Sequence, residues 1–206
     1  RAPADVVATE LPAGVSIAAL NAPNLTVVSG TDAAIRAFTT RLDTTGIPHR
    51  RLHTSHAYHS PMMDQVVEPF AAIVAATPRR APDLRWTSSL TGQPVTDDES
   101  TDPRYWARQL REPVQFACGV GELLDGHFAL IEVGPGRALA TLARQHDRCP
   151  ATQLVATSLN PGQDWSADID HLLGAAGRLW ARNVDIDWHR FHGAQRRRVP
   201  LPTYPF

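Results

Sequence analysis

Short apolar runs, each closed by a turn of proline, glycine or asparagine, constrain the fold of this chain most strongly. Residues 15–20 and 25–29 are two such runs, rich in β-branched side chains and separated by Asn21-Ala22-Pro23-Asn24. They predict two antiparallel strands joined by a tight turn. A helix is predicted to follow from Thr31, its N-cap, and a third strand over residues 48–54. This alternation predicts a small α+β unit with an antiparallel sheet.

The rest of the chain is predicted to alternate helices with short strands. Apolar periodicity indicates helices over residues 61–74, 103–110, 114–124, 137–143 and 165–182, and strands over residues 84–90, 128–133 and 152–159. The loop Asn160-Pro161-Gly162 is predicted to be a boundary. We therefore expect an α/β chain in three parts, residues 1–60, 61–160 and 161–206.

Composition excludes several classes of protein. The 206 residues are 43% hydrophobic and 20% charged, which is typical of a globular chain, and the net charge of -1 gives no electrostatic reason to expect nucleic acid or a membrane as partner. No apolar run approaches the roughly 20 residues that span a bilayer. Cys118, predicted to be buried, and Cys149 offer no disulfide framework and fit a reducing cytoplasm. The chain starts at Arg1 without a signal peptide or initiator Met, so we expect it to be cut from a longer protein.

Three histidines at three-residue spacing, His53, His56 and His59, precede Pro61. A histidine on a strand-to-helix turn is held in place yet open to a cleft, which suits a general base. Imidazole also binds zinc, but along an extended strand His53 and His59 lie too far apart to share one ion, and the run contains no carboxylate. From the spacing alone, a general base, a metal site and three histidines without a chemical role all stay open.

The segment Gly134-Pro135-Gly136 lies between a predicted strand and a predicted helix. Backbone amides at such a point could hold an anion, but the segment lacks the Lys-Ser/Thr of a phosphate loop. We therefore favour a close strand-to-helix turn.

Five blocks of the sequence, in order, resemble the acyltransferase domains of modular type I polyketide synthases, in the malonyl-CoA:acyl carrier protein transacylase family. They are Ala18-Ala19-Leu20-Asn21-Ala22-Pro23, Ser55-His56-Ala57-Tyr58-His59-Ser60-Pro61-Met62-Met63, Tyr105-Trp106-Ala107-Arg108-Gln109-Leu110-Arg111-Glu112-Pro113-Val114-Gln115-Phe116, Ile131-Glu132-Val133-Gly134-Pro135-Gly136-Arg137-Ala138-Leu139 and Leu201-Pro202-Thr203-Tyr204-Pro205-Phe206. Any one block alone would be a weak signal. Together they cover nearly the whole chain, which makes the resemblance specific.

The resemblance implies the C-terminal half of such a domain and the linker that follows it. Residues 1–60 are expected to form a ferredoxin-like small subdomain, inserted in an α/β-hydrolase-like core. Residues 61–160 are expected to be the C-terminal part of that core, and residues 161–206 the post-acyltransferase linker. The family's nucleophile elbow, Gly-His-Ser-x-Gly, does not occur in the 206 residues. We therefore expect the nucleophile upstream of Arg1 and the chain alone to be inactive.

The resemblance also implies the chemistry. His59 is expected to be the catalytic base for a serine that attacks an acyl-CoA thioester, after which the acyl group passes to the phosphopantetheine thiol of an acyl carrier protein. The backbone carbonyl of Gln109 is expected to orient the His59 ring. The domain is expected to hold no cofactor and no metal. Its expected partners are the acyl-CoA, the carrier protein, the upstream half of the domain and the neighbouring ketosynthase, in a multifunctional enzyme of antibiotic biosynthesis.

His56, Ala57 and Tyr58 match the family's selectivity motif, in which His-Ala-Phe-His accompanies malonyl units and Tyr-Ala-Ser-His methylmalonyl units. An aromatic ring at Tyr58 leaves no room for a methyl group on the α-carbon, so malonyl is expected. The Tyr58 hydroxyl needs a partner if it is buried. Two alternatives stay open: a non-catalytic scaffold fragment of a synthase module, and the same chemistry with methylmalonyl or another acyl-CoA.

Overall fold

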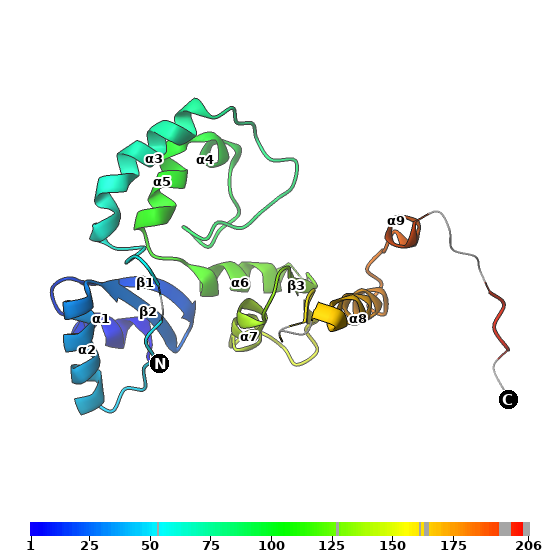
Figure 1. The fold of residues 1–206 in the computed structure, drawn as a ribbon, viewed down its shortest axis with the longest axis horizontal. Coiled ribbons are helices and arrows are strands. Elements are labelled where there is room, and N and C mark those ends of the chain that lie inside the picture. The colour runs from blue at the N-terminus through cyan, green and yellow to red at the C-terminus, as the bar shows by residue number, and fades with distance from the viewer. Residues whose placement is uncertain (53, 127, 161, 163–164, 194–198, 204–206) are drawn as a thin grey trace. The chain divides into compact units, whose positions relative to one another are not determined.

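Two compact units make up the chain in the computed structural model (Figure 1). Unit 1 consists of residues 1–128 and 141–153, and unit 2 of residues 129–140 and 154–206. These units cut across the predicted parts, because residues 129–140 and 154–160 belong with the C-terminal segment. The structure describes all residues except 53, 127, 161, 163–164, 194–198 and 204–206. His53 and the segment Tyr204-Pro205-Phe206 therefore lie outside the described residues.

Unit 1 contains the predicted β-hairpin. β1 (Val15–Ala22) pairs antiparallel with β2 (Leu25–Gly30), and residues 23–24 form the turn between them. α1 (Ala4–Glu10) precedes the hairpin and α2 (Asp32–Thr44) follows it. The Thr31 hydroxyl accepts a hydrogen bond from the Ala34 N–H at 3.2 Å, which confirms the predicted N-cap of α2.

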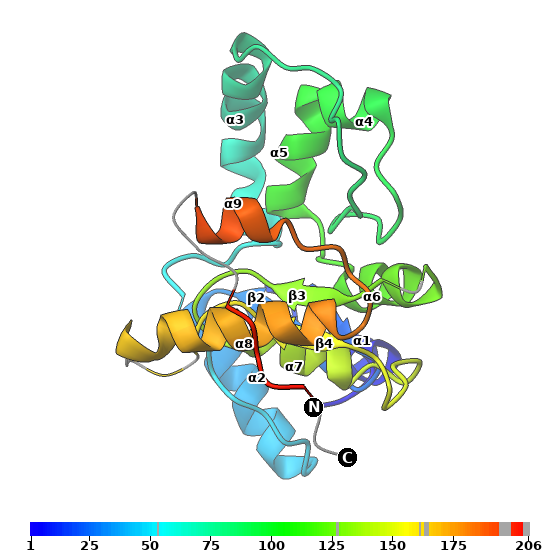
Figure 2. The same ribbon diagram turned by 90° about the vertical axis from the view of Figure 1, so that its right-hand side faces the viewer.

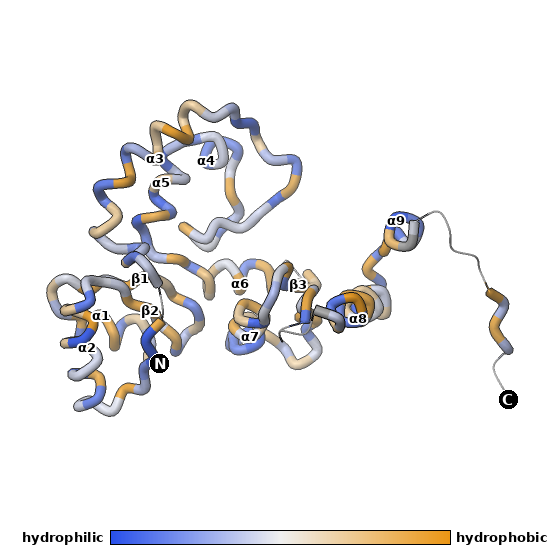
Figure 3. The backbone as a smooth tube through the Cα atoms, in the orientation of Figure 1, coloured by the Kyte–Doolittle hydropathy of each residue, from blue (hydrophilic) through white to orange (hydrophobic). Residues whose placement is uncertain are grey.

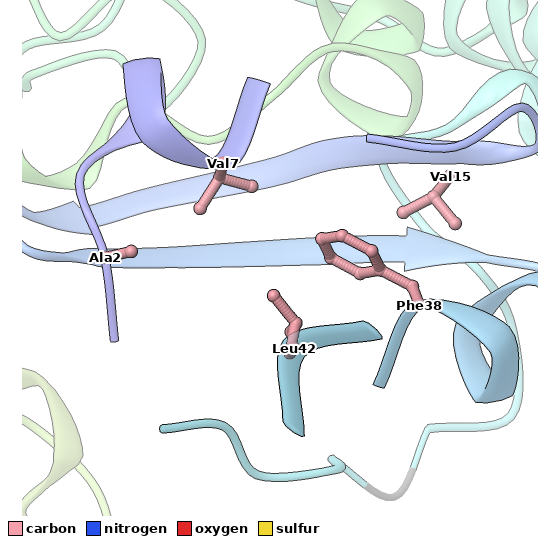
Figure 4. Close-up of a cluster of buried hydrophobic side chains, with 5 residues drawn as sticks. All are labelled: Ala2, Val7, Val15, Phe38 and Leu42. Atoms are coloured by element: carbon pink, nitrogen blue, oxygen red, sulfur yellow. The ribbon is translucent and has the colours of Figure 1, made fainter. Parts of the chain in front are cut away.

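The core of this part of unit 1 lies between the hairpin and its two helices (Figure 4). Its buried members come from α1, β1, α2 and the N-terminal segment, and they are Ala2, Val7, Val15, Phe38 and Leu42. Phe38 is only 2% exposed. The apolar stripe predicted for α2 therefore points into the core at Phe38 and Leu42, as its helical spacing requires.

Two predicted strands are wrong. Residues 48–52 and 54 have no strand structure, and the segment 84–90 contributes only an isolated bridge between Thr87 and Pro94. A strand forms only where a neighbour offers matching N–H and C=O groups. The free edge of β1 is used by a distant residue instead: Val114 donates to the Ala18 carbonyl at 2.9 Å and accepts from the Leu20 N–H at 2.8 Å.

The second half of unit 1 is helical. A 3₁₀ turn, η1 (Pro61–Met63), leads into α3 (Asp64–Ala76), which lies beside α5 (Pro103–Arg111) in Figures 1 and 2. The predicted start of α5 is confirmed, because the Asp102 carboxylate accepts from the Arg104 N–H at 2.9 Å and proline follows the cap.

One helix of this half, α4 (Asp97–Thr101), is not among the predicted elements. Thr96 and Glu99 form a capping box at its start, a Thr-x-x-Glu signature that was readable in the sequence. The last helix of this half is α6 (Phe116–Asp125), and it carries Cys118. That thiol is exposed rather than buried, which corrects the prediction, because Gly119 and Val120 take the inward positions of the helix.

Unit 2 contains a parallel strand pair. β3 (Leu130–Glu132) pairs in parallel with β4 (Val155–Thr157), and α7 (Ala138–Arg144) lies between them in sequence, with the boundary between the units inside it. η2 (Trp165–Ala167) and α8 (Asp168–Trp180) follow, and Figure 2 shows α8 alongside β4. The short α9 (Trp188–His192) comes last. The chain is thus α/β, with one antiparallel and one parallel strand pair in the described residues.

Apolar residues recur along the helices α3 and α8 (Figure 3), and several of them are exposed. On α8, Ile169 is 68% exposed and Trp180 61%. Among the described residues no helix combines the length and the apolar composition that crossing a bilayer requires.

Candidate active site

His59 has an unusual backbone conformation. Its φ is 60°, and among the described residues Asn183 is the only other non-glycine residue with a positive φ. This left-handed conformation costs roughly 1–2 kcal/mol for a residue with a Cβ, although histidine adopts it more often than most residues. Such strain persists only where the surroundings fix the residue, and it is frequent at functional sites.

Two backbone carbonyls hold His59. Its N–H donates to the Leu110 carbonyl at 2.9 Å, and its ring atom Nδ1 lies 2.9 Å from the Glu112 carbonyl oxygen. Because a carbonyl can only accept, Nδ1 must carry the ring proton, and Nε2 of the neutral ring is then left as the acceptor. A ring held in this way has its basic nitrogen in a fixed position.

The orienting carbonyl belongs to Glu112 and not to Gln109, which corrects the prediction. Gln109 lies inside α5, where carbonyls point along the helix axis. Glu112 is the C-cap, with an extended backbone (φ -85°, ψ 154°), so its carbonyl leaves the helix direction and reaches the ring. A backbone carbonyl does contact this nitrogen, as predicted, but it belongs to the residue three positions after the predicted one.

The β-hairpin anchors both sides of this arrangement. On one side, Val114 is bonded to β1, two residues beyond Glu112. On the other, the Ser29 hydroxyl of β2 donates to the Tyr58 carbonyl at 2.7 Å. The hairpin and the end of α5 therefore converge on His59 from segments that lie far apart in the sequence.

Ser60 closes the turn that contains His59. It is 1% exposed, and its hydroxyl donates to the Ala57 carbonyl at 2.6 Å and accepts from the Met62 N–H at 3.3 Å. It is also the N-cap of η1, with Pro61 as the first residue of that turn. Sequence reasoning assigned Ser60 no role, although a serine directly before a proline is a cap signature.

The predicted selectivity residues lie next to His59. The rings of His56 and Tyr58 are 5.8 Å apart between centroids and tilted by 53°. His56 is exposed, Tyr58 is 43% exposed and Ala57 is half-buried. At this exposure water can reach the Tyr58 hydroxyl, so no buried partner is needed.

Two other candidate sites came from the sequence, a histidine metal site and an anion site at the Gly-Pro-Gly segment. His53 of the metal alternative lies outside the described residues, and within those residues no three His, Cys, Asp or Glu side chains are grouped as metal ligands. Across the Gly134-Pro135-Gly136 segment, the Glu132 carboxylate accepts from the N–H groups of Leu139 at 3.2 Å and Ala140 at 2.8 Å. The chain's own carboxylate thus binds the start of α7, in agreement with the favoured close turn.

Comparison with known protein families shows which family this chain belongs to. The acyl transferase domain model matches residues 4–165. The chain belongs to the acyl transferase domain family. It is 38% identical over 204 residues to the phenolphthiocerol synthesis polyketide synthase type I Pks15/1 of Mycobacterium bovis, covering 98% of the chain and 9% of that protein. It is also 38% identical over 194 residues to polyketide synthase GfsA of Streptomyces halstedii, covering 93% of the chain and 3% of that protein.

Solved structures agree with this membership. The acyltransferase domain from the second module of the salinomycin polyketide synthase is 33% identical with a TM-score of 0.87, over 98% of this chain and 48% of that one. The acyltransferase domain of SpnD, solved with 2-(pent-4-yn-1-yl)malonyl, is 34% identical with a TM-score of 0.82, over 87% and 44% of the two chains. The acyltransferase chain therefore spans about half of these solved domains and a small part of the synthases it resembles.

Proposed function

We propose that this chain supplies the general base of a polyketide synthase acyltransferase. The enzyme would move a malonyl extender unit from malonyl-CoA to the phosphopantetheine thiol of an acyl carrier protein. The observation that carries this proposal is the His59 ring, whose Nδ1 is bonded to the Glu112 carbonyl and whose Nε2 is left as the acceptor. Membership of the acyl transferase family supplies the reaction class.

In the proposed mechanism, His59 acts twice as base and twice as acid. Its Nε2 takes the proton of a serine hydroxyl as the serine oxygen attacks the malonyl thioester, and the imidazolium then protonates the leaving thiolate of coenzyme A. The carrier-protein thiol next gives its proton to Nε2 as it attacks the acyl-serine, and the proton returns to the serine oxygen. No oxidant, metal or cofactor of the domain enters this cycle.

The serine is proposed to lie outside residues 1–206. No Gly-x-Ser-x-Gly occurs within them, and the chain spans 48% of the salinomycin acyltransferase chain. His59, with its left-handed backbone and its two hydrogen bonds to carbonyls, is then one half of a catalytic pair. The isolated chain is proposed to be inactive.

The finer description of the architecture belongs to the same proposal. Unit 1's β1–β2 hairpin with α1 and α2 would form part of a ferredoxin-like small subdomain, and the parallel pair β3–β4 part of an α/β-hydrolase-like core. The C-terminal segment would be the linker toward neighbouring synthase domains. The carrier protein and the ketosynthase would be partners in one multifunctional protein of the cytoplasm, where two free thiols remain reduced.

Malonyl is the proposed extender unit because the rings of His56 and Tyr58, which precede the base in the chain and lie 5.8 Å apart, would line the space for the acyl group. A methyl group on the α-carbon would have to share that space. One methyl group changes transition-state binding by only about 1–3 kcal/mol, so the rings would create a preference and not an absolute choice.

A double replacement tests this selectivity. The variant His56→Tyr/Tyr58→Ser of the complete domain is expected to shift the methylmalonyl-to-malonyl ratio of kcat/KM upward by about 10-fold or more, because serine frees the volume of a ring. Competition between the two acyl-CoA substrates, with the acylated carrier protein measured by mass, gives the ratio. An unchanged ratio would mean that Tyr58 does not face the substrate. Tyr58→Phe is the matched control and should keep the wild-type ratio.

A further inference from the structure

The end of α5 carries a charged side chain between the two carbonyls that hold His59. Leu110 and Glu112 supply those carbonyls, and the residue between them is Arg111, the last residue of α5. A rotation of the backbone at Arg111 therefore changes the direction of the Glu112 carbonyl relative to the Leu110 carbonyl, which binds the His59 N–H.

Arg111 is itself fixed by an ion pair. Its guanidinium Nε donates to the carboxylate of Asp64, the first residue of α3. The two side chains are 31% and 59% exposed. Each charge also has the favourable sign for its helix end, negative at the start of α3 and positive at the end of α5.

Asp64 is joined to His59 by a short stretch of hydrogen-bonded chain. The five-residue step from His59 runs through Ser60, which is buried and hydrogen-bonded, and through the 3₁₀ turn η1. These contacts form a closed circuit. His59 is bonded to the carbonyls at the end of α5, Arg111 at that end is paired with Asp64, and the chain leads from Asp64 back to His59. The Arg111–Asp64 ion pair is the contact in this circuit that is made by side chains alone.

We propose that Asp64 and Arg111 are positioning residues for His59. They hold the Leu110–Glu112 backbone in place. The hydrogen bond from Nδ1 to the Glu112 carbonyl then keeps the proton on Nδ1 and fixes the direction in which Nε2 points. The inference rests on the proposed function, since it concerns how the base of that reaction is held. An exposed ion pair contributes little to stability, so its removal should misalign the base without unfolding the domain.

Replacement of one partner tests the proposal in the complete acyltransferase domain. Asp64→Asn is expected to lower kcat about 3- to 5-fold, as the modest strength of an exposed ion pair allows, with the KM for malonyl-CoA within about 1.5-fold, since a displaced base slows proton transfer more than binding. Arg111→Gln should have the same effect, and the double variant should be no slower than either single variant. Asp64→Glu, which keeps the charge, should recover most of the lost kcat.

Two controls separate positioning from general weakening. Asp125→Asn breaks the Arg148–Asp125 pair, an ion pair at 2.8 Å with side chains 51% and 65% exposed, in the same unit. It should shift the melting temperature as little as Asp64→Asn does, by about 3 °C or less, and leave kcat unchanged. Imidazole ¹⁵N shifts should show the Nδ1–H tautomer of His59 in the wild type and a mixture of tautomers in Asp64→Asn.

The outcomes are separable from failure of the proposed function. A kcat of Asp64→Asn within twofold of the wild type would overturn the positioning role, even if His59 proves essential. Equal losses of kcat and melting temperature in Asp64→Asn and Asp125→Asn would overturn it as well, in favour of a purely structural contact. Full activity after replacement of His59 would instead refute the proposed function.

Discussion

The variant His59→Asn of the complete acyltransferase domain is expected to lose at least about a thousandfold in kcat for malonyl transfer while keeping its fold. General bases contribute about 10²–10⁴-fold, and a base that serves both half-reactions should lie in the upper part of this range. Asparagine is the suitable replacement because it tolerates the left-handed backbone that His59 adopts at φ 60°. Alanine would add backbone strain to the loss of the imidazole, and the two effects would be confounded.

His49→Asn is the matched control for this variant. The Nδ1 atom of His49 also lies near a backbone carbonyl, that of Ile47 at 3.2 Å, and the ring's contacts, Ile47 and Asp43, are not among the residues that hold His59. Its replacement should leave kcat within about twofold of the wild type, because only an imidazole in the site can relay the proton. Near-normal turnover of His59→Asn would show that the base is another residue, with His56 the next candidate.

The second large effect is expected on stability, from Phe38→Ala. Phe38 is 2% exposed at the centre of the cluster between the hairpin and α2, so removal of the ring leaves a cavity there (Figure 4). Truncation of a buried phenylalanine costs about 3–5 kcal/mol. Urea unfolding of the complete domain, followed by circular dichroism, should show a loss of this size in the first transition. Phe38→Leu keeps most of the apolar volume and should cost less than about 1.5 kcal/mol.

This stability effect should reach the site through the hairpin. The hairpin's strands bind Val114 and the Tyr58 carbonyl, which flank the His59 arrangement on both sides. Phe38→Ala should therefore lower the midpoint of thermal inactivation together with that of unfolding. A variant that loses activity well below its unfolding transition would show that the hairpin and the site are not coupled in this way.

Elements whose signals are local could be predicted from the sequence. The turn at residues 23–24, the Thr31 cap and the Asp102-Pro103 start of α5 each depend on neighbouring residues, and each is present in the structure. The helix α4 belongs to the same class, because its capping box at Thr96 and Glu99 is local, although the helix is not among the predicted elements. Caps and tight turns are decided by groups a few residues apart, so the sequence alone suffices for them.

Features that need a partner far along the chain could not be predicted. The segment after α2 has the composition of a strand, but the free edge of β1 is bonded to Val114. Strand formation depends on such pairing, which residue preferences do not encode. The exposure of Cys118 has the same origin, because apolar spacing in α6 does not say which face is packed.

The site shows both cases in one place. His59 and its neighbours His56 and Tyr58 form a continuous motif, so sequence reasoning reached them together. The carbonyl at the ring comes from the end of a helix that begins more than forty residues later, and there the predicted Gln109 had to be corrected to Glu112. The change from helical to extended backbone at the C-cap decides which carbonyl turns toward the ring. Pro113 signals this change locally, because the residue before a proline favours extended backbone, but the contact of that carbonyl with the distant His59 is not encoded by neighbouring residues.

The central claim, that His59 activates a nucleophile outside residues 1–206, is tested most directly by locating the acyl group. The complete domain is incubated with malonyl-CoA, quenched in acid, digested and mapped by mass spectrometry, with the isolated 206-residue chain treated in parallel. We predict malonate on one serine that lies outside these residues, strongly reduced adduct in His59→Asn, and none on the isolated chain. Malonate on a residue within the 206, or undiminished acylation of His59→Asn, would contradict the claim, and no acylation of the complete domain would favour a scaffold.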